Sequence, residues 1–233
     1  MTPVKDDGVS VMEIGESSEF EPAVSLTEQI ADHLGRQIIT GRLEPQERIQ
    51  ELRVAGDLGV SRGSVREALL ILESRHLIEI IPRRGAVVSS LEADEIVNFN
   101  ELHTDLQTSF YRKLALERSA DLSELQQVLE RIDQAVAQHD LDGLLGACRA
   151  FADVSLPLVN NFYLASVLRG LIPAGLRLAH MAACHPDYEM RDTLRYHHAL
   201  LDAIVRNDDA RVGELVPAYS RRQGKLAVLS VTG

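Results

Sequence analysis

The chain has 233 residues, a hydrophobic fraction of 45% and only 4% aromatic residues, with no Trp. This length suffices for two domains, and the composition favours helices over a β-sandwich. The net charge of −11 at pH 7 argues against nonspecific coating of nucleic acids, and the two cysteines, Cys148 and Cys184, have neither zinc-finger nor disulfide-framework spacing. We find no membrane-spanning run of about 18 apolar residues and no signal-peptide pattern, so we expect a cytoplasmic protein without a membrane partner.

The acidic charge is spread unevenly along the chain. Residues 1–24 carry one Lys and six acidic residues, whereas residues 25–90 carry nine Arg and nine acidic residues. Residues 91–233 are again acidic, with a net charge of −6. A basic face on the middle segment is therefore compatible with the acidity of the whole chain.

The first part of the chain reads as a tail followed by short helices. Residues 1–24 contain Pro, Gly, Ser and acidic residues without periodicity, which predicts a disordered tail. The sequence Ser25-Leu-Thr-Glu28 is a capping box, and it predicts a helix over 25–40 that ends at Gly41. Apolar spacing then predicts two further helices, over 50–58 and 61–75.

The helix predicted over 61–75 has one apolar face and one polar face. Ser61 is suited to cap its N-terminus, and Val65, Leu69 and Leu72 recur at helical spacing. The first turn and the opposite face would carry short polar groups and guanidinium groups, which suit the groove and phosphates of duplex DNA. These residues are Arg62, Gly63, Ser64 and Arg66.

A hairpin is predicted next. Two short strands, over 77–81 and 86–89, enclose the turn sequence Pro82-Arg-Arg-Gly85. Three helices followed by a hairpin make a winged helix-turn-helix DNA-binding domain, here over residues 25–90. Its tip would place Arg83 and Arg84 at a second phosphate backbone or a minor groove.

From residue 91 onward the pattern is helical only. Broad apolar stripes predict an antiparallel helical bundle over residues 91–233, so the predicted fold class is α with a small β wing. Pro157, Pro173 and Pro217 fall inside the predicted segments, where they predict kinks or displaced boundaries. The predicted helices cover 93–118, 123–138, 141–159, 163–184, 188–206 and 209–229.

Three motifs in residues 25–90 resemble the GntR family of bacterial transcription regulators. The resemblance implies that Ser61, Arg62, Ser64 and Arg66 contact operator DNA and that Gly85 lies at the wing tip in the minor groove. Leu52 departs from the pattern, because many relatives carry a DNA-contacting Arg there, and the adjacent Arg53 is a candidate substitute. The motifs are Thr27-Glu-Gln-Ile30 with Ile39-Thr-Gly-Arg-Leu-Glu-Pro45, Leu58-Gly-Val-Ser-Arg-Gly-Ser-Val-Arg-Glu-Ala-Leu69, and His76-Leu-Ile78 with Pro82-Arg-Arg-Gly-Ala-Val-Val88.

The helical remainder resembles the FadR-like effector domain (FCD) of the same family, through Arg149-Ala-Phe151, Asn161 and His197-His-Ala-Leu-Leu-Asp-Ala-Ile204. Members of this subgroup often bind a divalent metal through an Asp and three His. The corresponding positions here are Cys148, Ala152, His197 and Tyr219, and only His197 matches.

Because two donors at most are available at these positions, we expect no metal cofactor. A noncognate zinc site completed by His180 and Cys184 is the alternative. We instead expect a metal-free pocket for a small-molecule effector, such as an acyl-CoA, a fatty acid or a small carboxylate. A filled core in which His197 and Tyr219 hydrogen-bond to each other is the alternative to this pocket. The predicted polar groups of the pocket are Cys148, Arg149, Arg177, His180, His197 and Tyr219.

The function predicted from these features is that of a ligand-responsive, sequence-specific regulator of transcription. It would bind a palindromic DNA operator as a homodimer, and repression is the family default. One alternative is an enzyme, with Cys148, His180, His197 and Asp202 as its raw material, although no nucleophile motif or phosphate loop is present. Another is a protein-interaction module without DNA binding, against which the arginine cluster argues.

Overall fold

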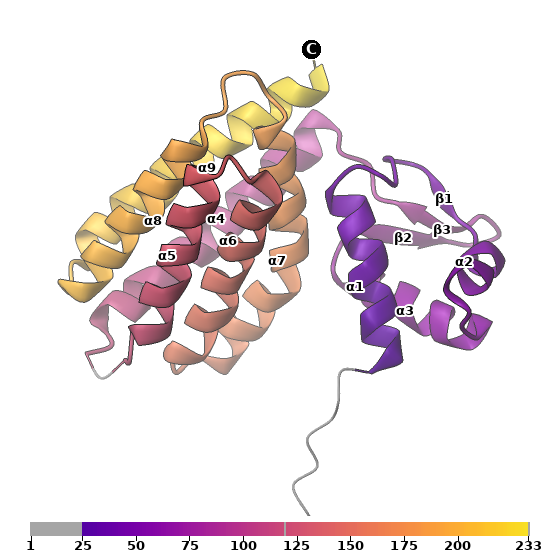
Figure 1. Cartoon of the computed structure of the whole chain (residues 1–233), viewed down its shortest axis with the longest axis horizontal. Coiled ribbons are helices and arrows are strands. Elements are labelled where there is room, and N and C mark those ends of the chain that lie inside the picture. Colours follow the sequence, from indigo (N-terminus) through magenta and orange to yellow (C-terminus); the bar gives the residue numbers. More distant parts are fainter. Residues whose placement is uncertain (1–24, 119, 233) are drawn as a thin grey trace, which may run out of the picture.

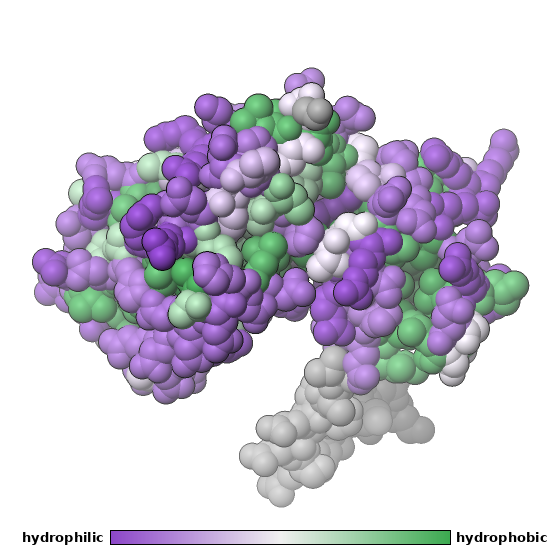
Figure 2. Space-filling model, turned by 45° about the horizontal axis from the view of Figure 1, so that its top comes forward, coloured by the Kyte–Doolittle hydropathy of each residue, from purple (hydrophilic) through white to green (hydrophobic). Residues whose placement is uncertain are grey.

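The computed structural model of the chain describes residues 25–118 and 120–232. The tail predicted over residues 1–24 lies outside the described residues. The chain forms an N-terminal head with a small sheet and a C-terminal helical bundle, which lie side by side with α1 (Leu26–Ile39) facing α7 (Phe162–Ala183) (Figure 1). On the face shown in Figure 2, hydrophilic residues predominate and the hydrophobic ones form separate patches.

The head is a winged helix-turn-helix, as predicted. Its helix α1 begins with the expected capping box, in which the Ser25 hydroxyl accepts from the Glu28 amide at 3.2 Å and the Glu28 carboxylate accepts from the Ser25 amide. The first helix of the DNA-binding pair, α2 (Glu51–Leu58), ends at Gly59, whose φ of 65° allows the tight turn. The second helix, α3 (Arg62–Ser74), follows at once.

The wing contains one strand more than the two predicted. Strands β2 (Ile78–Ile81) and β3 (Gly85–Val88) form the expected antiparallel hairpin, and β1 (Arg48–Ile49) pairs antiparallel with the other edge of β3. A strand of two residues is too short to show alternation in the sequence, so only its partner makes it a strand. It ties the segment before α2 to the wing.

The bundle consists of α-helices and one 3₁₀ helix, packed around a core that includes Phe110 and Phe151, both 1% exposed. The long helices α4 and α9 lie against each other, and α5 to α8 cover them (Figure 1). The bounds are α4 (Ala93–Leu116), α5 (Ser123–Ala137), α6 (Leu141–Ser155), η1 (Leu156–Leu158), α7 (Phe162–Ala183), α8 (Met190–Val205) and α9 (Asp209–Thr232).

The three prolines have different effects. Pro157 ends the predicted 141–159 helix early: α6 stops at Ser155 and the chain continues as the 3₁₀ turn η1. Pro173 and Pro217 lie inside α7 and α9, which continue past them. Each removes one backbone hydrogen bond, but α7 and α9 pack against each other, and this packing holds both helices.

Within the described residues, α7 is long and apolar enough to cross a membrane by length and composition, with a mean hydropathy of 1.2 over its most apolar window. From the sequence, no such run is predicted. The helix contains Arg169 and Arg177, however, and it packs against α1, α4, α6 and α9. A core helix passes the same test, so this finding is weak evidence for a membrane span.

Candidate functional site

The helix α3 presents an apolar face to the head and a basic face to solvent. Ser61 caps it by accepting a hydrogen bond from the Ser64 amide at 3.0 Å. Arg62 and Gly63 of the same turn are exposed. Val65 is fully buried, whereas the side chains of Arg62 and Arg66 are 63% and 68% exposed. The predicted outward face is therefore the exposed face.

Glu51 at the start of α2 contacts both of these arginines, and this contact is not predicted from the sequence. Its carboxylate accepts from Arg66 at 3.4 Å (Nε) and 3.1 Å (Nη2), and it lies 4.0 Å from Arg62 Nη2. Such exposed pairs contribute little to stability, but a two-point contact fixes the direction of the Arg66 guanidinium. The residues are 15 positions apart, so no sequence pattern indicates the contact.

The wing tip carries the next two cations. Arg83 adopts a left-handed backbone with φ of 67°, and Gly85 does so with φ of 86°. Arg83 and Arg84 are exposed, and Arg48 of β1 lies beside Gly85. The wing therefore brings three arginines together, of which the sequence analysis singled out two.

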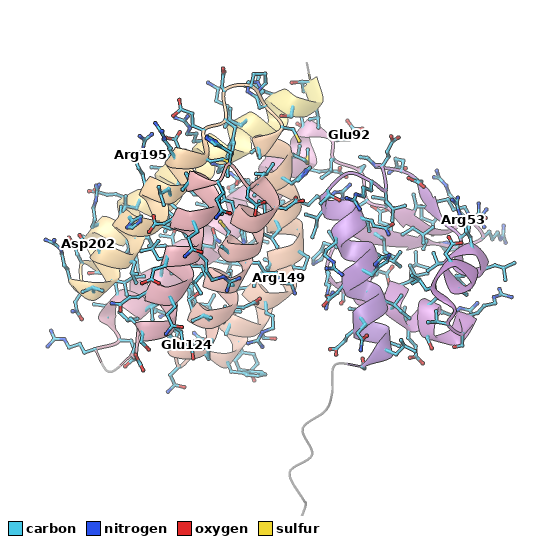
Figure 3. All side chains as sticks on the ribbon, viewed as in Figure 1. Arg53, Glu92, Glu124, Arg149, Arg195 and Asp202 are labelled. Atoms are coloured by element: carbon cyan, nitrogen blue, oxygen red, sulfur yellow. The ribbon has the colours of Figure 1, made fainter. Side chains whose placement is uncertain are left out.

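Arg53 lies on α2 at the end of the head away from the bundle (Figure 3). Its side chain is 76% exposed and lies 3.7 Å from Asp57, and the adjacent Leu52 is 69% exposed. The exposed arginines of α2, α3 and the wing can bind phosphates, and the first turn of α3 can enter a major groove.

A cavity of about 130 Å³ lies inside the bundle between α4, α6, α7, α8 and α9. The four positions that correspond to the family's metal ligands, Cys148, Ala152, His197 and Tyr219, all line it. Arg149 lies at the cavity's side nearest the head, and its Nε is 3.4 Å from the Asp153 carboxylate (Figure 3).

Two residues predicted for the pocket do not line it. Arg177 turns from α7 toward the junction with the head, where its Nη2 donates to the Ser89 carbonyl at 3.1 Å. His180 lies one turn further along α7, with its Nδ1 3.9 Å from the Cys184 sulfur. Helical periodicity explains both, because they lie on faces of α7 other than the one that carries the cavity-lining Gly175 and Ala179.

The polar groups at the cavity are held neutral by burial. His197 is 7% exposed, its Nδ1–H donates to the Thr193 carbonyl at 2.8 Å, and burial lowers its pKa to about 4. Burial also raises the pKa of the Cys148 thiol to about 12 and the pKa of Tyr219 well above its ordinary value. A protonated thiol in such surroundings is a poor nucleophile.

His197 and Tyr219 do not hydrogen-bond to each other; their ring centroids are 6.4 Å apart. The Tyr219 hydroxyl is instead bonded to Thr193 Oγ1 at 2.9 Å, which is bonded in turn to the Tyr188 hydroxyl at 2.9 Å. Tyr219 also stacks on Tyr196, with ring centroids 3.9 Å apart. These contacts order one wall of the cavity.

Two cavity residues escaped the sequence analysis. His103 of α4 reaches the cavity over Gly175, where a Cβ atom would lie 2.9 Å from its Cε1, and burial lowers its pKa to about 4. Gln223 of α9 is 5% exposed, and neither of its side-chain amide atoms has a hydrogen-bond partner among the described residues. Both residues lie outside the motifs of the family.

Neither a metal centre nor a catalytic cluster forms from the predicted residues. Within residues 25–118 and 120–232, no group of three or more His, Cys, Asp or Glu side chains could hold a metal ion. Asp202 lies on the outer side of α8 (Figure 3) and pairs with Arg206 at 2.8 Å, and it does not line the cavity that contains Cys148.

The junction between head and bundle is fixed by polar contacts. Besides the bond from Arg177 to Ser89, the Ser90 hydroxyl donates to the Glu95 carboxylate, which also accepts from the Glu92 amide at 3.1 Å. A groove between α1 and the bundle shares Leu145, Arg149 and Leu176 with the cavity wall. The cavity therefore lies one side-chain layer from the head.

Comparison with known proteins matches both parts of the chain. Residues 26–88 match the gntR family of bacterial regulatory proteins, and residues 100–220 match the FCD domain. The chain is 29% identical over 188 residues to the HTH-type transcriptional regulator McbR of Escherichia coli (strain K12), covering 79% of this chain and 85% of that protein. It is 26% identical over 204 residues to the gluconate operon transcriptional repressor of Bacillus licheniformis, covering 85% of this chain and 84% of that protein.

A solved structure, E. coli McbR/YncC, has the same fold, with a TM-score of 0.74 and 23% sequence identity. The match covers 90% of this chain and 100% of the McbR/YncC chain.

Proposed function

Since the chain belongs to the gntR family of bacterial regulatory proteins and carries an FCD domain, it is a transcriptional regulator, and we propose that it acts as a ligand-responsive repressor. In this proposal, the protein works in the cytoplasm and binds a palindromic operator as a homodimer. The family of its relatives also sets aside the enzyme and the protein-interaction module as alternatives, because these relatives are DNA-binding regulators.

The DNA-binding role rests on one observation. Arg62 and Arg66 lie exposed on the first turns of α3, and both lie within 4.0 Å of the Glu51 carboxylate. A recognition helix placed in the major groove would bring Arg62 and Arg66 to base edges and phosphates, with Arg83 and Arg84 on the flanking backbone. One such head reads only a short half-site, so a homodimer on a palindrome supplies the specificity. The repressor sign is supported by the gluconate operon repressor among the relatives.

The test of this function is selection of bound sequences from a random pool of DNA duplexes. We expect an inverted repeat whose half-site centres lie one helical turn apart, about 10 base pairs, or a multiple of it. The protected complex should contain two protein chains by native mass spectrometry. An asymmetric site, or no enrichment at all, would contradict the proposal.

We propose the bundle cavity as the effector site and propose that binding there needs no metal. A cavity of about 130 Å³ matches a ligand of about one ring, since an apolar cavity of about 150 Å³ binds benzene. This size favours a small ligand over the acyl-CoA considered from the sequence.

The proposed route from the effector to the DNA runs along α7. One face of this helix lines the cavity through Ile172, Gly175 and Ala179, and Arg177 on another face holds the Ser89 carbonyl at the junction. A ligand that shifts α7 therefore shifts the anchor of the head. Because an effector acts only through different affinities for two arrangements, this link is where the two arrangements would differ.

Replacing Arg177 by methionine, which keeps most of the buried stem and removes the donor, should loosen the head from the bundle. We expect the ¹⁵N-relaxation correlation time of residues 26–88 to fall below that of the bundle in the variant, and to equal it in the wild type. Arg169→Met is the matched control, because Arg169 is exposed on the same helix. Equal correlation times in the Arg177 variant would refute the proposed link.

A further inference from the structure

Gln223 is a buried polar side chain whose amide has no hydrogen-bond partner among the described residues; Asp192 Oδ2 also has none but forms an ion pair with Arg222. Gln223 lies on α9 in the wall of the cavity, is 5% exposed, and neither its Oε1 nor its Nε2 is hydrogen-bonded to any described residue. Buried polar groups are normally paired, because desolvating them without a partner is unfavourable. An amide offers a donor and an acceptor side by side, so its natural partner is a group with the same pair in reverse.

The cavity lining offers little to a charged ligand. It contains no Asp, Glu or Lys, and its one cationic side chain, Arg149, is 39% exposed and has its Nε 3.4 Å from the Asp153 carboxylate. The other titratable groups at the wall are neutral near pH 7, because burial lowers the pKa of His103 and His197 to about 4 and raises the pKa values of the tyrosines and Cys148. A charge placed inside would lose its hydration, and the one cation at the wall already has an acidic neighbour in Asp153.

The aromatic wall sets the shape of the ligand. Tyr196 and Tyr219 stack at 3.9 Å with an interplanar angle of 6°, and His197 meets Tyr196 edge to face at 5.0 Å. Ile172 and Leu144 add apolar lining beside these rings. A flat group of about one ring fits such a space and benefits from ring contacts.

We propose that the effector is an uncharged molecule of about one ring that carries a neighbouring donor and acceptor, as in a primary amide or a lactam, and that Gln223 recognises this pair. The inference rests on the proposed effector role of the cavity and names its ligand class. It replaces the acyl-CoA and carboxylate classes, because the cavity volume is about that of one ring and the cation at its wall, Arg149, already has the Asp153 carboxylate beside it. The His197 ring, with Nδ1 committed to Thr193, presents Nε2 as a further acceptor.

The test uses three probes of equal size and different charge: benzamide, benzoate and benzylamine. We expect benzamide to raise the melting temperature of the full chain saturably, by about 2–4 °C once its free concentration exceeds its Kd several-fold. Benzoate and benzylamine at the same ionic strength should leave it unchanged. An equal or larger shift with benzoate or benzylamine, or no shift with benzamide, would overturn the proposal.

The variant Gln223→Leu assigns the effect to the residue. It should abolish the benzamide shift, and its melting temperature without probe should equal or exceed that of the wild type, because it removes two unpartnered polar atoms. Gln127→Leu is the matched control: Gln127 is exposed on α5 and should keep the full benzamide shift. A benzamide shift that persists in Gln223→Leu would overturn the role of Gln223.

One measurement on the wild type keeps the inference testable even if the variant misfolds. The side-chain amide resonances of Gln223 should shift with benzamide and not with benzoate, and unchanged resonances would overturn the inference. Failure here is distinguishable from failure of the regulatory function, because operator selection is read without any probe. A protein that selects an inverted repeat but ignores benzamide is a regulator with a different effector class.

Discussion

Alanine in place of both Arg62 and Arg66 is expected to weaken binding to the selected operator by about a hundredfold or more. A guanidinium that reads a guanine edge contributes about 1–3 kcal/mol, and both side chains lie exposed on the first turns of α3. Truncating Arg66 also leaves Glu51 as an unpaired carboxylate at the interface, which would repel phosphates. Fluorescence anisotropy with the labelled operator measures the loss.

The salt dependence of operator binding by the same variant separates base readout from general attraction to phosphates. If both arginines also neutralise phosphates, the slope of log K against log salt should become shallower by about 2. The control pair is Arg131→Ala with Arg206→Ala, two exposed arginines of the bundle, which changes the net charge equally. Retained operator affinity in the Arg62/Arg66 variant, or an equal loss in the control, would refute α3 as the recognition helix.

Phe151→Ala should cost the bundle about 3–5 kcal/mol of unfolding free energy. Phe151 is 1% exposed and its ring contacts His197 edge to face at 5.0 Å and Tyr111 at 6.3 Å, so the substitution removes a ring from the centre of the core. The neighbouring helices are held by the rest of the core, so they can fill the cavity left by the ring only in part. Urea unfolding followed by circular dichroism measures the loss.

Phe162→Ala is the matched control for this prediction. Phe162 is 76% exposed at the start of α7, and among the described residues its ring contacts one other aromatic ring, that of Tyr163 at 5.6 Å. The same change of side chain should therefore alter the unfolding free energy by no more than about 0.5 kcal/mol. Similar losses in the two variants would show that Phe151 is not the core residue described above.

Local signals accounted for most of the head. The capping box of Ser25 and Glu28 and the cap at Ser61 each act over a few neighbouring residues, and both occur in the structure as the sequence predicts. The family and the fold class, predicted from motifs and periodicity, are confirmed by the matches over residues 26–88 and 100–220. Strand β1 was missed because two residues carry no pattern.

The candidate sites divide in the same way. Cys148, His197 and Tyr219, which the sequence grouped through the family's landmarks, line one cavity from three helices. The sequence also grouped Arg177 and His180 with them, although each lies on another face of α7. The sequence of α7 itself has apolar residues on most faces of the helix. It therefore does not indicate which face lines the cavity.

By itself, the sequence determined the kind of each part: a winged helix-turn-helix with an arginine-rich first turn on its recognition helix, followed by a helical bundle whose metal ligands are replaced. These features depend on caps, periodicity and motifs, which are properties of short segments. Only the tertiary structure decided which distant side chains meet, as Glu51 meets Arg66 and Arg177 meets Ser89. It alone also left the Gln223 amide buried without a partner, because burial and pairing depend on how whole helices pack around one another.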